Sequence, residues 1–142
     1  MIDARTAPYG GLVLRLMLGI FFLVHGLIKV FVFTIPGFVK FFVAVGFSPT
    51  LAYLILLAEL GGGAALVLGL WTRWIALILF VEMLEVVHFH FANGFGFTQP
   101  HGGWEYPAMW AVALLVQVLL GDGAFAIDSV LFARRRARIQ TA

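Results

Sequence analysis

Ionisable side chains lie inside segments that are otherwise apolar. Glu59 stands near the centre of residues 51–70, and Glu82 and Glu85 stand near the centre of residues 74–91. A charged side chain in the middle of a lipid bilayer is costly, so such residues usually face the interior of a protein and often mark a site. These acids are therefore the first candidates for chemistry in this chain.

Basic side chains accompany the acids. His25 and Lys29 lie in the apolar residues 12–33, four positions apart and therefore on one face of a helix. His88 and His90 lie toward the end of the third apolar stretch. The combination of carboxyl, ammonium and imidazole groups is suited to binding a polar ligand and to exchanging protons.

Helix geometry predicts which of these groups can meet. With a rise of about 1.5 Å per residue, Glu59 and Glu82 lie near the same depth, and His25 and Glu85 lie roughly 3–5 Å outward of them. Lys29 lies about 9–10 Å outward. Leaving a buried charge unpaired is costly, so we predict that Lys29 pairs with at least one of Glu59 and Glu85.

Three interpretations of this cluster stay open. The cluster binds a small polar or quinone-like molecule or carries a proton path, or it is an ion-pair network that only fixes the structure. A metal site is the third, because Glu85 and His88 have Glu-x-x-His spacing, with Glu59 and His25 nearby. A di-iron bundle needs two such units and two more glutamates. Only one unit is present, so the metal motif is weak.

Composition places the chain among integral membrane proteins. Of its 142 residues, 63% are hydrophobic and 11% are charged, unlike a soluble domain. A helix needs about 20 apolar residues to cross the hydrocarbon core. The candidates predict one all-α domain over residues 1–142, a bundle of four transmembrane helices without a soluble catalytic domain. The predicted spans are residues 12–33, 50–70, 73–91 and 106–120.

The chain has no cysteine. This excludes disulfide exchange, thiolate metal sites and thiol nucleophiles. Redox chemistry would therefore require a bound cofactor or a partner subunit.

Lysine and arginine predict the orientation in the membrane. Arg73 lies between the second and third spans, whereas residues 92–104 contain neither Lys nor Arg. Both termini are therefore predicted to be cytoplasmic. Further arginines follow the fourth span, and we expect them to rest on anionic lipid rather than to bind nucleic acid. They are Arg134, Arg135, Arg136 and Arg138.

Two connecting segments and a glycine pair carry further predictions. In residues 34–49, aromatic side chains at helical spacing predict a short amphipathic helix in the outer interface, with Lys40 reaching the headgroups. Residues 93–107 form either an interfacial turn or a lid over the outer mouth of the bundle. Gly62 and Gly63 are expected to face another helix, because glycine lets helices approach closely.

Several short phrases in a fixed order resemble the DoxX family of small four-span bacterial membrane proteins, from about residue 12 to residue 128. The phrases are Leu14-Arg15-Leu16 with Gly19, His25-Gly26 with Lys29, Val45-Gly46-Phe47-Ser48-Pro49, Glu59-Leu60-Gly61-Gly62-Gly63, Gly69-Leu70-Trp71-Thr72-Arg73, His90 with Asn93-Gly94-Phe95, Trp104-Glu105-Tyr106, and Gly121-Asp122-Gly123 with Ile127-Asp128.

The resemblance implies a four-helix protein of the bacterial cytoplasmic membrane. Relatives are associated with quinone-linked sulfur oxidation, with quinone or catechol stress and with membrane redox complexes. Glu82 and Glu85 depart from the family pattern, which is usually apolar around the position of Met83. The residues that the resemblance favours are Arg15, His25, Lys29, Glu59, His90, Asn93 and Glu105.

We expect a redox-associated membrane protein that binds a quinone or a similar small molecule near the outer leaflet. Lys29 and His25 would polarise a carbonyl oxygen, and Glu59, Glu85 or Glu105 would exchange the proton. The alternatives are a non-enzymatic subunit of a larger membrane complex and a transporter of protons or small solutes, so the sequence does not decide whether the protein is an enzyme. The candidate ligand-binding residues are Arg15, His25, Lys29, Glu59, Glu82, Glu85, His88, His90, Asn93 and Glu105.

Overall fold

The structure, a computed structural model, describes residues 3–129, and the regular secondary structure of that part is entirely helical. This confirms the predicted all-α bundle. The elements in chain order are α1 (Ala7–Phe31), α2 (Ile35–Ala44), α3 (Pro49–Leu57), the π-helical turn η1 (Ala58–Gly62), α4 (Gly63–Leu68), α5 (Thr72–His90), the 3₁₀ turn η2 (Phe91–Asn93) and α6 (Glu105–Leu120).

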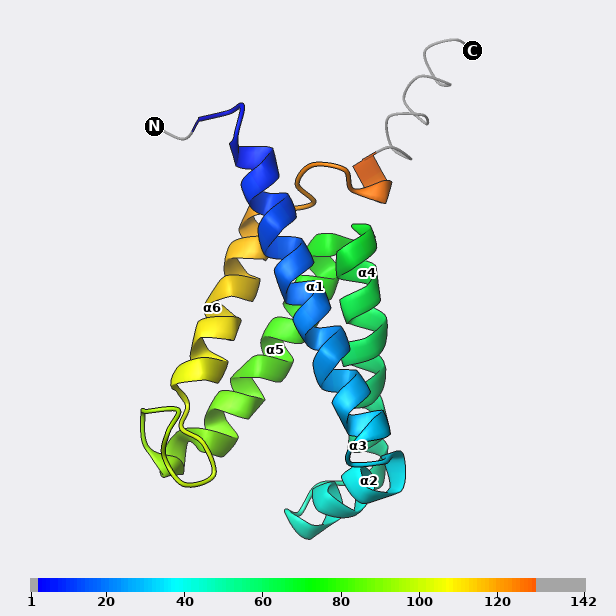
Figure 1. The fold of residues 1–142 in the computed structure, drawn as a ribbon, viewed down its shortest axis with the longest axis vertical. Coiled ribbons are helices and arrows are strands. Elements are labelled where there is room, and N and C mark those ends of the chain that lie inside the picture. Colours follow the sequence, from blue (N-terminus) through cyan, green and yellow to red (C-terminus); the bar gives the residue numbers. More distant parts are fainter. Residues whose placement is uncertain (1–2, 130–142) are drawn as a thin grey trace.

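Three helical rods are long and apolar enough to cross a membrane, and they span Ala7–Phe31, Pro49–Leu68 and Thr72–Asn93. The fourth helix, α6, is apolar but has only 16 residues, fewer than the roughly 20 needed for a perpendicular crossing. Figure 1 shows the chain running along the bundle four times in alternating directions, so that both ends of the described chain lie at the same end of the molecule. This is the layout of an antiparallel four-helix bundle.

Local sequence explains where several helices begin and end. The Ser48 side chain accepts a hydrogen bond from the Leu51 amide at 3.3 Å, and Pro49 occupies the first turn of α3. Thr34 caps α2 in the same way by accepting from the Gly37 amide. Gly69 ends α4 with a left-handed φ of 70°, which glycine adopts without steric strain.

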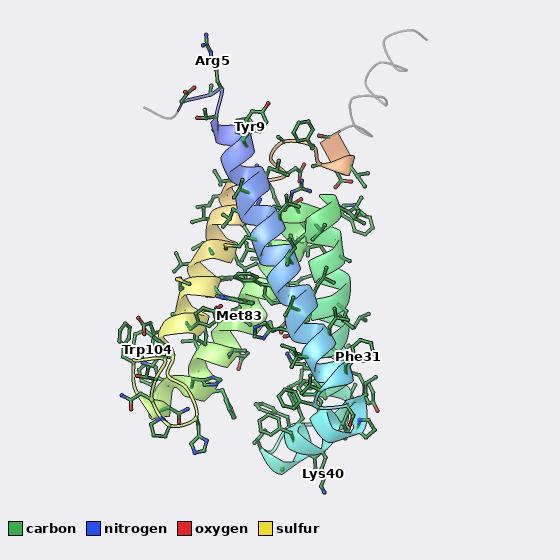
Figure 2. The ribbon with its side chains drawn as sticks, viewed as in Figure 1. Arg5, Tyr9, Phe31, Lys40, Met83 and Trp104 are labelled. Carbon is green, nitrogen blue, oxygen red and sulfur yellow. The ribbon has the colours of Figure 1, made fainter. Side chains whose placement is uncertain are left out.

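The short helix predicted in residues 34–49 is confirmed as α2. Its Phe38 side chain packs with Ala52 and Leu56 of α3 in a small apolar cluster. Lys40 projects away from the bundle at the opposite end from Arg5 (Figure 2). The placement of α2 in a membrane interface stays a prediction.

The bundle consists of two helix pairs. One pair joins α1 to η1 and α4, and the other joins α5 to α6. The pairs meet where η1 and α4 contact α5 and where α1 contacts α6, and they diverge toward the end that carries α2 (Figure 1). The buried core where they meet comprises Leu18, Phe22, Leu66, Ala76, Leu79, Met83, Trp110, Ala111 and Leu114.

Glycines allow the close approach of these helices. A Cβ atom built on Gly63 would lie 2.9 Å from the Gly19 carbonyl oxygen, and one on Gly62 would lie 3.3 Å from the Leu79 side chain of α5. The prediction that Gly62 and Gly63 face other helices is therefore confirmed. Gly61 points outward, with only the Leu57 side chain near a built Cβ, at 3.9 Å.

Candidate binding site

A buried ion pair joins the first two rods of the bundle. The Lys29 Nζ of α1 lies 2.5 Å from Oε1 and 2.6 Å from Oε2 of Glu59, which stands in η1. The side chains are 17% and 5% exposed, respectively. The predicted pairing of Lys29 is therefore confirmed for Glu59. Removing either partner would leave the other charge uncompensated in an apolar region.

The acid of this pair stands in a π-helical turn. In η1, Ala58–Gly62, the helix widens by one residue before α4 resumes at Gly63. Such turns are rare and often occur at functional sites, where they change the direction in which a side chain points. The turn places Glu59 against Lys29 of α1 on one side and against α5 on the other.

A second acid, Glu82 of α5, completes the cluster. Its side chain is buried, and its carboxyl group lies close enough to Glu59 and Lys29 to be affected by both. Its Oε2 atom has no hydrogen-bond partner in the described residues. The prediction that Glu59 and Glu82 share one depth is confirmed by this proximity. The cluster of Lys29, Glu59 and Glu82 is called the charged cluster below.

An aromatic wall adjoins the charged cluster. His25 lies one helical turn before Lys29 on the same face of α1, and its exposed ring packs edge-on against Trp110 of α6 at a centroid distance of 5.1 Å. Phe21 stacks on Trp110 at 5.6 Å, and Tyr106 lies 5.7 Å from it. The wall thus offers flat apolar rings and one imidazole beside a buried ionic group.

Trp110 was missed as a candidate by the sequence reasoning. The sequence did contain a signal for Trp110. Tryptophan in a membrane protein usually lies in the interfacial belts, whereas Trp110 lies inside the predicted span of residues 106–120. Trp110 lies within α6, Glu105–Leu120, and is 6% exposed.

Glu85 and His88 lie outside the charged cluster. Both are exposed on α5, and neither contributes to the ion pair of Lys29. Of the two partners that were considered for Lys29, Glu59 forms the ion pair and Glu85 does not. A step of three residues turns a side chain by about 60° around the helix, and it is Glu82 that faces Lys29. Within residues 3–129, no group of three His, Asp or Glu side chains is arranged to hold a metal.

Three other candidates shape the loop between α5 and α6. The His90 Nδ1 lies 2.8 Å from the Val86 carbonyl oxygen, and Asn93 donates to the Gly102 carbonyl oxygen at 2.8 Å. A carboxylate oxygen of Glu105 accepts from the Phe97 amide at 3.2 Å. The Asn93 and Glu105 contacts order the loop, whereas the His90 contact stays within α5, and none of the three joins these side chains to the charged cluster.

Arg15 lies in the first half of α1 and contacts the segment that follows α6. Its buried guanidinium packs against Gly69 and donates to the Ala124 carbonyl oxygen at 3.2 Å. Asp128, in the same segment, accepts from the Trp71 amide at 2.6 Å. Arg15 therefore anchors the segment after α6 and lies apart from the charged cluster.

Comparisons with known proteins identify a family and a relative of this chain. The family model DoxX matches residues 10–92. The Bacillus subtilis (strain 168) protein named "Putative oxidoreductase CatD" is 35% identical over 83 residues, which are 58% of this chain and 60% of that protein. The chain thus matches about three fifths of the length of this relative. No solved structure matches.

Proposed function

The chain belongs to the DoxX family, and on this premise we propose that it is a redox-associated membrane protein that binds a quinone or a similar small molecule. The proposed site lies between the aromatic wall and the charged cluster, where the helix pairs diverge. The observation that carries the proposal is the exposed His25 ring packed on Trp110, one turn from the buried pair of Lys29 and Glu59.

The residues suit different parts of such a ligand. A planar ring can stack on the aromatic wall, and His25 can donate a hydrogen bond to a carbonyl oxygen. Lys29 is already engaged by both oxygens of Glu59, so we assign the contact with the carbonyl to His25. The free oxygen of Glu82 can accept a hydrogen bond from a ligand hydroxyl.

The redox assignment is supported by the name of the Bacillus relative, which describes an oxidoreductase. The chain has no cysteine, so in this proposal the electrons come from a partner subunit or from another membrane enzyme. The competing functions are a subunit that only packs in a larger membrane complex and a transporter of protons or small solutes.

We also propose a bacterial cytoplasmic membrane location, contact with membrane lipid on the outer helix faces and cytoplasmic termini. Arg5 lies at the end of the bundle where the ends of the described chain lie, and Lys40 lies at the opposite end (Figure 2). Arg73 approaches Gly121, which follows directly after α6, and α6 ends at the same end of the bundle at which α1 begins (Figure 1). This distribution follows the rule that cytoplasmic segments are enriched in Lys and Arg. The terminal arginine cluster that contributed to this prediction lies outside the described residues.

A fluorescence titration tests the binding proposal. The purified protein, with Trp71, Trp74 and Trp104 replaced by Phe, keeps Trp110 as its single tryptophan and is placed in lipid nanodiscs. A short-chain benzoquinone, which quenches indole fluorescence, is expected to quench Trp110 saturably. His25→Phe is expected to weaken binding about tenfold, through the loss of one well-placed hydrogen bond.

His88→Phe is the matched control, because His88 is exposed on α5 and takes no part in the aromatic contacts of Trp110. It should leave the affinity unchanged. Quenching that grows linearly with quinone concentration and is equal in both variants would exclude a site at the wall.

A further inference from the structure

We propose that the charged cluster binds one exchangeable proton, carried by Glu82, and is therefore a proton-binding site inside the membrane domain. The position of this proton beside a ligand site rests on the proposed function. Its test uses no quinone, so its failure is distinguishable from failure of ligand binding.

The charges of the cluster do not balance when all its groups are ionised. The charged cluster contains one ammonium, from Lys29, and two carboxyl groups, from Glu59 and Glu82. With both carboxyl groups ionised, the buried cluster would carry one uncompensated negative charge. Burying an unpaired charge in a medium of low dielectric constant is strongly unfavourable. A single bound proton makes the cluster neutral.

Within residues 3–129, the elements around Glu82 supply it with no other cation. Lys29 of α1 and Glu59 of η1 are the charged groups that act on it. The helix α4, Gly63–Leu68, contains no titratable side chain, and α6 contains none after Tyr106. On α5 itself, Glu85 is exposed and is also an acid. A proton is therefore the remaining means of neutralising Glu82.

The hydrogen bonds decide which acid carries the proton. Both oxygens of Glu59 accept from Lys29, at 2.5 and 2.6 Å, which favours the ionised form of Glu59. Glu82 has a buried oxygen without a partner, so its ionised form lacks the donors that stabilise the carboxylate of Glu59. Binding converts a carboxylate and a proton into a carboxylic acid by forming one O–H bond, and no electron is transferred.

Infrared spectroscopy of the purified full-length protein tests this assignment. In micelles of a detergent that contains no ester or acid group, the carbonyl band of a protonated carboxyl group is expected at neutral pH. Glu82→Gln should remove the intensity of one carboxyl group from this band. Glu85→Gln, a change of the same kind one turn along α5, is the control and should leave the band unchanged. An unchanged band in Glu82→Gln would overturn the proposal.

A second measurement needs no substitution. The apolar reagent dicyclohexylcarbodiimide adds to protonated carboxyl groups in membrane interiors, where the proton moves to nitrogen and the carboxyl oxygen bonds to the central carbon. Peptide mass spectrometry is expected to find the adduct on Glu82 rather than on Glu59, with a yield that falls as the pH is raised from neutral. An adduct mainly on Glu59, or a yield independent of pH, would contradict the assignment.

Discussion

Gly19 of α1 and Gly63 of α4 face each other so closely that neither position has room for a side chain. A Cβ atom on Gly19 would lie 2.8 Å from the Gly63 carbonyl oxygen, and one on Gly63 would lie 2.9 Å from that of Gly19. Two turns along α1, Gly26 meets Leu60 and Glu59 in the same way. This close approach of α1 to the second rod brings Lys29 within reach of Glu59.

The contact predicts opposite effects for two neighbouring glycines. Gly63→Ala should destabilise the protein by about 1–3 kcal/mol, because the new methyl group overpacks the helix interface. Gly61→Ala should be neutral or stabilising by about 0.5–1 kcal/mol, because the position is open and alanine favours a helix. Thermal unfolding in detergent, followed by circular dichroism, measures both changes. Equal effects of the two substitutions would contradict the close packing of α1 on α4.

The loop between α5 and α6 allows a similar comparison. A Cβ atom on Gly103 would collide with the carbonyl oxygens of Gly94, Phe95 and Gly96, whereas one on Gly96 would only approach the Thr98 hydroxyl, at 3.8 Å. Gly103→Ala should therefore open the loop and raise the amide hydrogen exchange of residues 94–104. Gly96→Ala should leave the exchange unchanged. If Gly103→Ala also leaves it unchanged, the tight turn is not maintained in solution.

The sequence predicts the fold well because hydropathy and helix length determine it. Residues 50–70 and 73–91 correspond closely to Pro49–Leu68 and to α5, Thr72–His90. The first span was predicted to start at residue 12, but α1 begins at Ala7, because Pro8 is well suited to a first turn. The same apolar segments are the basis for predicting four transmembrane helices.

The charged cluster was predictable only in part. The rise per residue places Glu59 and Glu82 at one depth, and the structure brings them together. The choice of Glu82 over Glu85 depends on how α5 rotates against α6, which hydropathy does not determine. The π-helical turn at Glu59 also depends on tertiary packing, because α1 and α5 contact it from two sides. The contact of Trp110 with His25 depends on the same tertiary packing.

The proposed orientation in the membrane can be tested with reporter fusions. Reporter fusions after residue 142 and in the loop near Thr98 should report opposite sides of the membrane, with the fusion after residue 142 cytoplasmic. The reason is that Arg5 lies at the end of the bundle where both ends of the described chain lie and that Arg73 contacts Gly121 just after α6, whereas the loop between α5 and α6 lies at the other end. Alkaline phosphatase and green fluorescent protein fusions provide the two readouts. Identical signals from both positions would show that α6 does not cross the membrane and would contradict the four-span arrangement.

The ion pair itself gives the sharpest stability prediction. Lys29→Met should cost about 3–5 kcal/mol, because it strands the buried carboxylate of Glu59 without a cation. Glu59→Gln should cost less than Lys29→Met, because Glu82 remains beside Lys29 as an alternative partner. The double variant Lys29→Met with Glu59→Gln should be more stable than the sum of the two single losses predicts.

The matched cycle pairs Lys29→Met with Glu85→Gln. Glu85 is exposed and takes no part in the ion pair of Lys29, so these two losses should add within about 0.5 kcal/mol. Reversible unfolding in mixed micelles, with urea or sodium dodecyl sulfate as denaturant, gives the four free energies of each cycle. Additivity in the Glu59 cycle would show that Lys29 and Glu59 are not coupled in the membrane domain. Coupling to Glu85 of the same size would show that α5 presents a different face to α1.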